Sequence, residues 1–235
     1  MGFLFPFTIL FNLVIKYTFM IPRPDESLWL TTVSDPMGFP SGGAQLAAVL
    51  WGLIYLNVHN KLRYLCWIPI IGIPVSRVYL GVHSIYDIAI GLMIGWATLK
   101  LWIKYFDTYF EENNASQKTF ISLGITFLTA LLYFLVAGDQ WTKLVPFSIG
   151  SLVGFSLSLP WLIAPDVKHI ERNWKALGIC LVISVVILKF IPQPEAETIE
   201  TLLLIPLKYG LLMLVVFGLY SKLLIMLQTR IKDRE

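Results

Sequence analysis

The sequence contains few charged residues for its length. Only 14% of its 235 residues are charged, against about 25% in soluble domains, and 57% are hydrophobic. This shortage of charge excludes an ordinary soluble domain. The net charge of +3 is small and gives no reason to expect a nucleic acid partner. We therefore expect an integral membrane protein.

Cysteine is scarce, and no metal-ligand spacing is present. Cys66 and Cys180 both lie in apolar stretches, where we expect thiols that face lipid or the protein core. Nothing in the sequence favours a disulfide between them. Since no histidine, cysteine and carboxylate pattern typical of a metal site occurs, we expect neither a metal nor another cofactor.

Long apolar runs dominate the chain, and a helix that crosses a bilayer needs roughly 20 mostly apolar residues. They predict an all-α fold, a polytopic membrane helical bundle. About eight transmembrane helices are expected, at 2–22, 42–59, 63–80, 84–104, 119–138, 143–163, 175–192 and 201–227. No basic residue precedes the first run, no small-residue cleavage site follows it, and it contains Lys16. We therefore expect a membrane helix there, not a signal peptide.

The distribution of basic residues predicts the orientation of these helices. If the N-terminus is cytoplasmic, most lysines and arginines lie on the cytoplasmic side: Lys61, Arg63, Lys100, Lys104, Lys118, Lys168, Arg172, Lys175, Lys222, Arg230, Lys232 and Arg234. The predicted outer loop at 192–200 is acidic. The positive-inside rule thus predicts that both termini are cytoplasmic.

Ionisable residues occur inside or beside several apolar runs. Lys16 lies within the first run, where an ionisable group is costly and indicates a functional site. The alternative is a lysine that snorkels to the membrane surface. The stretch VSRVYLGVHSIYDIAIG contains Arg77, His83 and Asp87. His83 and Asp87 share a helix face, so the carboxylate can accept the imidazole N–H and leave the other ring nitrogen free to act.

The stretch GFPSGGAQ has the composition of a helix start that binds phosphate. Ser41 precedes the predicted helix, and Gly42 and Gly43 have no Cβ to keep an anion from their N–H groups. Arginine and lysine side chains from the other stretches would supply positive charge at the same membrane face. The candidate phosphate ligands are Lys16, Arg23, Ser41, Gly42 and Arg77.

These elements resemble the signature of the type 2 phosphatidic acid phosphatase (PAP2) superfamily, which contains membrane lipid phosphatases and soluble haloperoxidases. Its motifs are K-x6-R-P, P-S-G-H and S-R-x5-H-x3-D, and the resemblance covers about residues 10–105. The chain is also similar to a bacterial subgroup with extra membrane helices after the core. The resemblance implies a PAP2-like catalytic membrane core at 1–105, a cytoplasmic linker at 106–118 and a C-terminal transmembrane extension at 119–235.

The resemblance also implies a mechanism that needs no metal. His83 would be the nucleophile that forms a phosphohistidine, and Asp87 would orient it and balance its charge. The candidate phosphate ligands would bind the phosphate oxygens and the charge that develops during transfer. The chain departs from the family at Gly43, which takes the place of the histidine that protonates the leaving oxygen.

Three hypotheses account for Gly43. In the first, which we favour, the substrate is an isoprenyl diphosphate such as undecaprenyl diphosphate, because a phosphate leaving group needs less proton donation than an alcohol. In the second, the protein is catalytically impaired and binds or transports phosphorylated lipids. In the third, Gly43 is a natural or engineered lesion in an ordinary lipid phosphatase. We expect phosphorylated lipids and membrane lipids as partners, and an extracytoplasmic site in a bacterial inner membrane.

Overall fold

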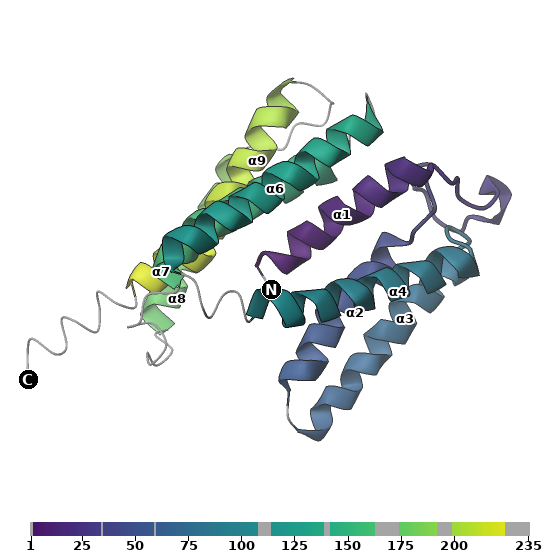
Figure 1. The fold of residues 1–235 in the computed structure, drawn as a ribbon, viewed down its shortest axis with the longest axis horizontal. Helices are drawn as coiled ribbons and strands as arrows, with labels where there is room; N and C mark the ends of the chain where they lie inside the picture. Colours follow the sequence, from purple (N-terminus) through teal and green to yellow (C-terminus); the bar gives the residue numbers. More distant parts are fainter. Residues whose placement is uncertain are drawn as a thin grey trace, which may run out of the picture. The chain divides into compact units, whose positions relative to one another are not determined.

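The computed structural model is built from helices, as Figure 1 shows. It describes residues 2–33, 35–58, 60–107, 114–138, 142–162, 174–191 and 199–223. Its α-helices are α1 (Leu4–Phe19), α2 (Gly42–Asn57), α3 (Trp67–Tyr79), α4 (Ile85–Leu101), α6 (Ala115–Ala137), α7 (Leu144–Leu162), α8 (Trp174–Phe190) and α9 (Ile199–Met213). Two 3-10 helices, η1 (Glu26–Leu28) and η2 (Lys61–Cys66), and two π-helical segments, η3 (Trp102–Asp107) and η5 (Leu214–Leu219), complete the described elements. The predicted all-α fold is confirmed.

Each of the eight predicted apolar runs overlaps one α-helix in the described part of the chain. Three described helical segments are long and apolar enough to cross a membrane: Ile85–Tyr105, Ala115–Ala137 and Leu203–Leu223. Three others are apolar but shorter: Leu4–Phe19, Leu144–Pro160 and Ile179–Lys189. These helices support association with a membrane, and eight complete crossings stay a prediction.

The chain forms two compact units, which we call unit 1 and unit 2. Unit 1 contains Phe3–Glu111 and Leu131–Thr142, and unit 2 contains Glu112–Ala130 and Lys143–Glu235. The division into core, linker and extension stays a prediction. Residues 108–113 of that linker and 192–198 of the predicted acidic loop lie outside the described residues.

In unit 1, α2 and α4 pack so closely that two positions on α4 require glycine. A Cβ on Gly91 would lie 2.6 Å from the Ser41 carbonyl oxygen, and one on Gly95 would lie 2.5 Å from that of Gln45. Small residues four apart let helix backbones approach in this way. Because residue 41 lies against 91 and 45 against 95, α2 and α4 run in the same direction and begin at the same end of unit 1.

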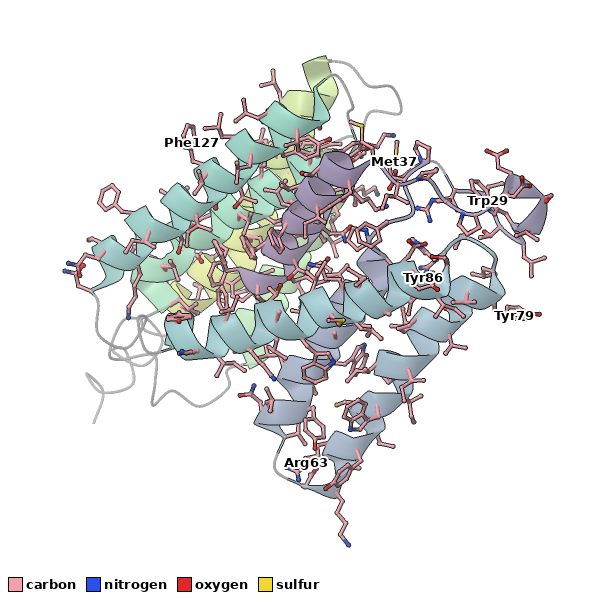
Figure 2. The ribbon with its side chains drawn as sticks, turned by 45° about the vertical axis from the view of Figure 1, so that its right-hand side comes forward. Trp29, Met37, Arg63, Tyr79, Tyr86 and Phe127 are labelled. Carbon is pink, nitrogen blue, oxygen red and sulfur yellow. The ribbon has the colours of Figure 1, made fainter. Side chains whose placement is uncertain are left out.

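The loop between α1 and α2 rests on the turn between α3 and α4. Leu30 N–H donates to the Leu80 carbonyl at 3.0 Å. Gly81 has a φ of 73°, and a Cβ there would lie 1.9 Å from the Leu28 carbonyl oxygen, so only glycine fits. Figure 2 shows Trp29 of this loop and Tyr79 and Tyr86 of the turn region at one end of unit 1, with Arg63 at the other end. The motif residues therefore gather at the end where α2 and α4 begin.

In unit 2, α7 and α9 make direct contact. A Cβ on Gly150 would lie 2.3 Å from the Pro206 carbonyl oxygen, and one on Gly154 would lie 2.2 Å from that of Gly210. The Phe147 and Tyr209 rings meet edge to face, with centroids 4.6 Å apart. None of the predicted site residues comes from unit 2.

Both cysteines are buried inside the units. Cys66 and Cys180 are free thiols, as expected for cysteines that lie in apolar stretches.

Candidate active site

The start of α2 forms one side of the candidate site. Ser41 is fully buried, and its hydroxyl accepts a weak hydrogen bond from Ala44 N–H at 3.5 Å as the helix N-cap. Its own N–H donates to the Asp87 carbonyl at 3.0 Å, which joins the start of α2 to the first turn of α4. The first N–H groups of an α-helix have no partner within the helix. Those of Gly42 and Gly43 are therefore suited to bind an anion.

A buried polar pair holds α1 against this helix start. Asn12 Nδ2 donates to Gln45 Oε1 at 2.8 Å and to the Pro40 carbonyl at 3.3 Å. A Cβ on Gly42 would lie 2.9 Å from Asn12 Oδ1. Glycine at position 42 therefore leaves room for Asn12 as well as for an anion. Asn12 and Gln45 belong to none of the sequence motifs, although an asparagine inside an apolar helix is a signal of a buried polar contact.

Lys16 and Arg23 lie on the loop side of the site, and both contact Asp35. Lys16 Nζ donates to Asp35 Oδ2 and, at 2.9 Å, to the Met37 carbonyl. Arg23 Nε donates to the Asp35 carbonyl at 2.6 Å, and its Nη2 lies 3.8 Å from Asp35 Oδ2. One carboxylate thus bridges two predicted phosphate ligands. Asp35 was not among the predicted site residues, because a single acid in a polar loop belongs to no recognisable spacing.

Arg23 also touches the predicted nucleophile. Its Nη1 donates to the Val82 carbonyl at 2.9 Å and lies 3.1 Å from His83 Nε2. Because a guanidinium can only donate, His83 Nε2 accepts and carries no proton, which leaves the proton on Nδ1. The unprotonated ring nitrogen is thus the one that faces the guanidinium of Arg23.

His83 is neutral at pH 7 in this environment. Only 7% of the residue is exposed. Burial, followed by the nearby charges of Arg23 and Lys16, lowers the pKa of His83 from 6.5 to about 4. A neutral imidazole is the nucleophilic form of histidine, since protonation removes the electron pair that attacks.

Asp87 lies beside His83 but makes its hydrogen bonds elsewhere. Its Oδ2 is 3.8 Å from His83 Nδ1, which is within ion-pair distance but too long for a hydrogen bond. The same oxygen accepts Ser84 N–H at 2.7 Å, while Ser84 Oγ accepts Asp87 N–H at 3.2 Å. This capping box fixes the start of α4. Asp87 therefore holds a negative charge near His83 while it stabilises a helix end.

Arg77 lies over the first turn of α2, next to Gly43. A Cβ on Gly43 would lie 3.4 Å from Arg77 Nε and 3.8 Å from Ile73 Cγ2. Arg77 is exposed, and among the described residues its guanidinium has no hydrogen-bond partner. It also lies close enough to Arg23 for the two charges to repel. The structure thus brings all the candidate residues to one end of unit 1.

No metal centre is evident in the described part of the chain. Histidine, cysteine and carboxylate side chains do not gather there in groups of three or more. The positive charge nearest His83 comes from Arg23 and Lys16, and Arg77 lies close to Arg23.

A comparison with protein families agrees with the arrangement of these residues. Residues 1–111 match the family model of the PAP2 superfamily. No curated protein and no solved structure matches the chain. The matched segment contains every candidate residue described above. Through its residues 1–111, the chain is a member of the PAP2 superfamily.

Proposed function

We propose that this protein removes a phosphate group from a lipid diphosphate by way of a phosphohistidine on His83. Membership of the PAP2 superfamily implies phosphoryl hydrolysis of the phosphatase type. The observation that most favours this particular chemistry is the 3.1 Å contact between His83 Nε2 and Arg23 Nη1. A buried neutral imidazole with its electron pair toward a cation is arranged to attack a phosphate bound by that cation.

In the proposed reaction, the cationic side chains of Lys16, Arg23 and Arg77 bind the phosphate oxygens together with the first N–H groups of α2. Bidentate guanidinium contacts and helix N-termini both suit this role. His83 Nε2 attacks phosphorus, and the bond from phosphorus to the leaving oxygen breaks, so that the leaving group takes the electron pair. Water then attacks the phosphohistidine, which releases phosphate and restores the neutral ring. Asp87 offsets the positive charge that the ring carries in the intermediate.

The diphosphate preference follows from Gly43. Glycine cannot donate a proton, so the leaving oxygen departs without help from this position. General acid catalysis is worth about 10²- to 10⁴-fold, and an alkoxide needs it far more than a phosphate does. An isoprenyl diphosphate such as undecaprenyl diphosphate would supply a phosphate leaving group and a membrane-bound tail. We place the site on the extracytoplasmic side because of the predicted distribution of basic residues.

The test is phosphate release by the purified full-length protein in detergent, with a chelator and no added metal. We expect faster release from undecaprenyl diphosphate than from phosphatidic acid, and none from either substrate with His83→Ala. Labelled phosphate should be trapped on the unmodified protein and not on this variant. Undiminished turnover in His83→Ala would refute the phosphohistidine.

A second candidate function is binding or transport of phosphorylated lipids without hydrolysis. The lack of a proton donor at Gly43 favours it, since the rest of an anion site is present. The same assay separates the two, because a binder would retain the lipid diphosphate and release no phosphate.

A further inference from the structure

We propose that Asp35 is an internal ligand of the phosphate site, which a phosphate group must displace to reach Lys16 and Arg23. The proposal rests on the proposed function in one respect, namely that these two cations bind the phosphate of the substrate. It adds a residue that lies outside the three family motifs and that limits the affinity of the site.

The contacts of Asp35 are those expected of a competing anion. Its Oδ2 accepts from Lys16 Nζ and lies 3.8 Å from Arg23 Nη2. The other two donor nitrogens of Arg23, Nε and Nη1, already bond to the Asp35 and Val82 carbonyls. Nη2 is thus the Arg23 nitrogen that can still donate to an incoming phosphate oxygen. The Asp35 carboxylate occupies the space next to it. A phosphate oxygen that bridged Lys16 and Arg23 would occupy the place of Asp35 Oδ2.

The carboxylate can leave without movement of its backbone. Just after Asp35 in the chain, the Pro36 carbonyl accepts Arg23 N–H at 3.1 Å, and Gly38 N–H donates to the Ile21 carbonyl at 2.9 Å. These bonds hold the loop in place around Asp35. The Asp35 side chain is 21% exposed, whereas those of Lys16 and Arg23 are 6% exposed. Rotation of one side chain toward water therefore clears the position between the two cations.

Displacement lowers the apparent affinity for phosphate by a predictable factor. A ligand that binds only one conformer has its affinity reduced by the fraction of molecules in that conformer. Minor conformers of proteins are commonly populated at about 0.1–10%. If Asp35 is turned away in about 1–10% of molecules, its removal should tighten phosphate binding by about 10- to 100-fold. Every ligand that uses both cations should gain by the same factor.

Asp35→Asn and Asp25→Asn form a matched pair for the test. Asp35 Oδ1 accepts Met37 N–H at 3.0 Å, and Asp25 Oδ1 accepts Ser27 N–H at 2.9 Å. An asparagine can keep either turn, and each substitution removes one negative charge from the same loop. Asp25 is exposed and forms no ion pair among the described residues, whereas Asp35 bridges Lys16 and Arg23. A comparison of the two variants therefore distinguishes the effect of losing the Asp35 contacts with Lys16 and Arg23 from the effect of removing one negative charge from the loop.

The measurement is the dissociation constant of inorganic phosphate for the full-length protein in detergent, by titration calorimetry at pH 7. We expect Asp35→Asn to bind phosphate about 10- to 100-fold more tightly than the unmodified protein, and Asp25→Asn to bind as the unmodified protein does. Equal or weaker binding by Asp35→Asn, or an equal gain in both variants, would overturn the proposal. Absence of phosphate binding in both the unmodified protein and Asp35→Asn would overturn it too.

A second measurement needs no variant, in case Asp35→Asn does not fold. When phosphate displaces the carboxylate, Met37 N–H loses its acceptor, so saturating phosphate should speed hydrogen exchange at the Met37 amide. Slower or unchanged exchange there would contradict the displacement.

The outcomes also separate this proposal from the hydrolase function. Lipid diphosphate hydrolysis with no gain in Asp35→Asn refutes only the role of Asp35. A gain in phosphate affinity without any hydrolysis refutes only the hydrolase.

Discussion

A histidine introduced at position 43 should speed the hydrolysis of phosphomonoesters. The structure has room for the substitution, because the nearest atoms to a Cβ on Gly43 are Arg77 Nε at 3.4 Å and Ile73 Cγ2 at 3.8 Å. These are ordinary van der Waals distances, and the closer atom belongs to an exposed side chain that can turn aside. Unlike Gly91 or Gly95, which abut backbone carbonyls, Gly43 accepts a side chain without movement of the backbone.

The size of the gain follows from the leaving group and from Arg77. A well-placed general acid is worth about 10²- to 10⁴-fold. The positive charge of Arg77 disfavours a protonated imidazole beside it, so we expect a gain at or below the lower end of this range, at least about tenfold, on phosphatidic acid. A diphosphate, whose leaving group is already a stable anion, should gain much less. Because only the imidazolium donates, the gain should grow as the pH falls.

The assay compares initial rates of phosphate release from phosphatidic acid and from an isoprenyl diphosphate at saturating substrate. Gly43→Ala is the matched control, since it adds the Cβ without a proton donor. Equal gains on both substrates would refute the leaving-group explanation, as would an equal gain with Gly43→Ala. The same conclusion would follow if the monoester rate did not rise while phosphate affinity was unchanged.

Three further predictions test the site, the packing and the orientation. In an NMR titration of the full-length protein, His83 should titrate with a midpoint near its pKa of about 4. The chain has three histidines, and the signal that is missing in His83→Ala identifies that of His83. In the unfolded chain this histidine has a pKa near 6.5, so between pH 6.5 and 4 protons bind the unfolded state in preference, and the free energy of unfolding should fall as the pH drops through this range. A midpoint near 6.5 for His83 in the folded protein would contradict its burial. Gly95→Leu should destabilise unit 1 by about 1–3 kcal/mol through overpacking, measured by thermal unfolding in detergent, whereas Gly72→Leu should not, because nothing lies within 4 Å of a Cβ there. A cysteine at Ser27 should react with an impermeant thiol reagent outside intact cells, and one at Asn113, outside the described residues, only after lysis; the reverse pattern would place the site in the cytoplasm.

Local chemistry explains why much of this fold could be predicted from the sequence. Apolar runs of helical length predicted all eight α-helices that the structure describes, and Ser41 stands where a helix N-cap is expected. The third run was less accurate, because its first residues form the 3-10 helix η2 and α3 begins only at Trp67. Long periodic segments depend mainly on local hydrophobicity, whereas the first residues of a helix also depend on how the preceding turn packs.

The spacing of the motifs predicted which residues meet but not how they are bonded. Arg23 and His83 were expected in one site, yet their direct contact depends on the path of the loop between α1 and α2. Asp35 could not be predicted, since its position between Lys16 and Arg23 is set by backbone bonds of that loop. Asp87 was predicted from its spacing to His83, while its capping box with Ser84 depends on where α4 begins. Polar contacts between distant segments follow from tertiary structure, which no spacing in the sequence encodes.

Because α2 and α4 are parallel, their N-termini give the site a positive electrostatic potential that comes from the backbone and not from side chains. Each helix N-terminus carries roughly half of a positive elementary charge, which arises from its aligned peptide dipoles. Two such ends meet here, joined by the hydrogen bond from Ser41 N–H to the Asp87 carbonyl. Their combined potential, equivalent to roughly one elementary charge, does not titrate and survives replacement of any single lysine or arginine. The attraction for anions is therefore partly a property of the backbone, and it persists as long as Gly91 and Gly95 keep the two helices in contact.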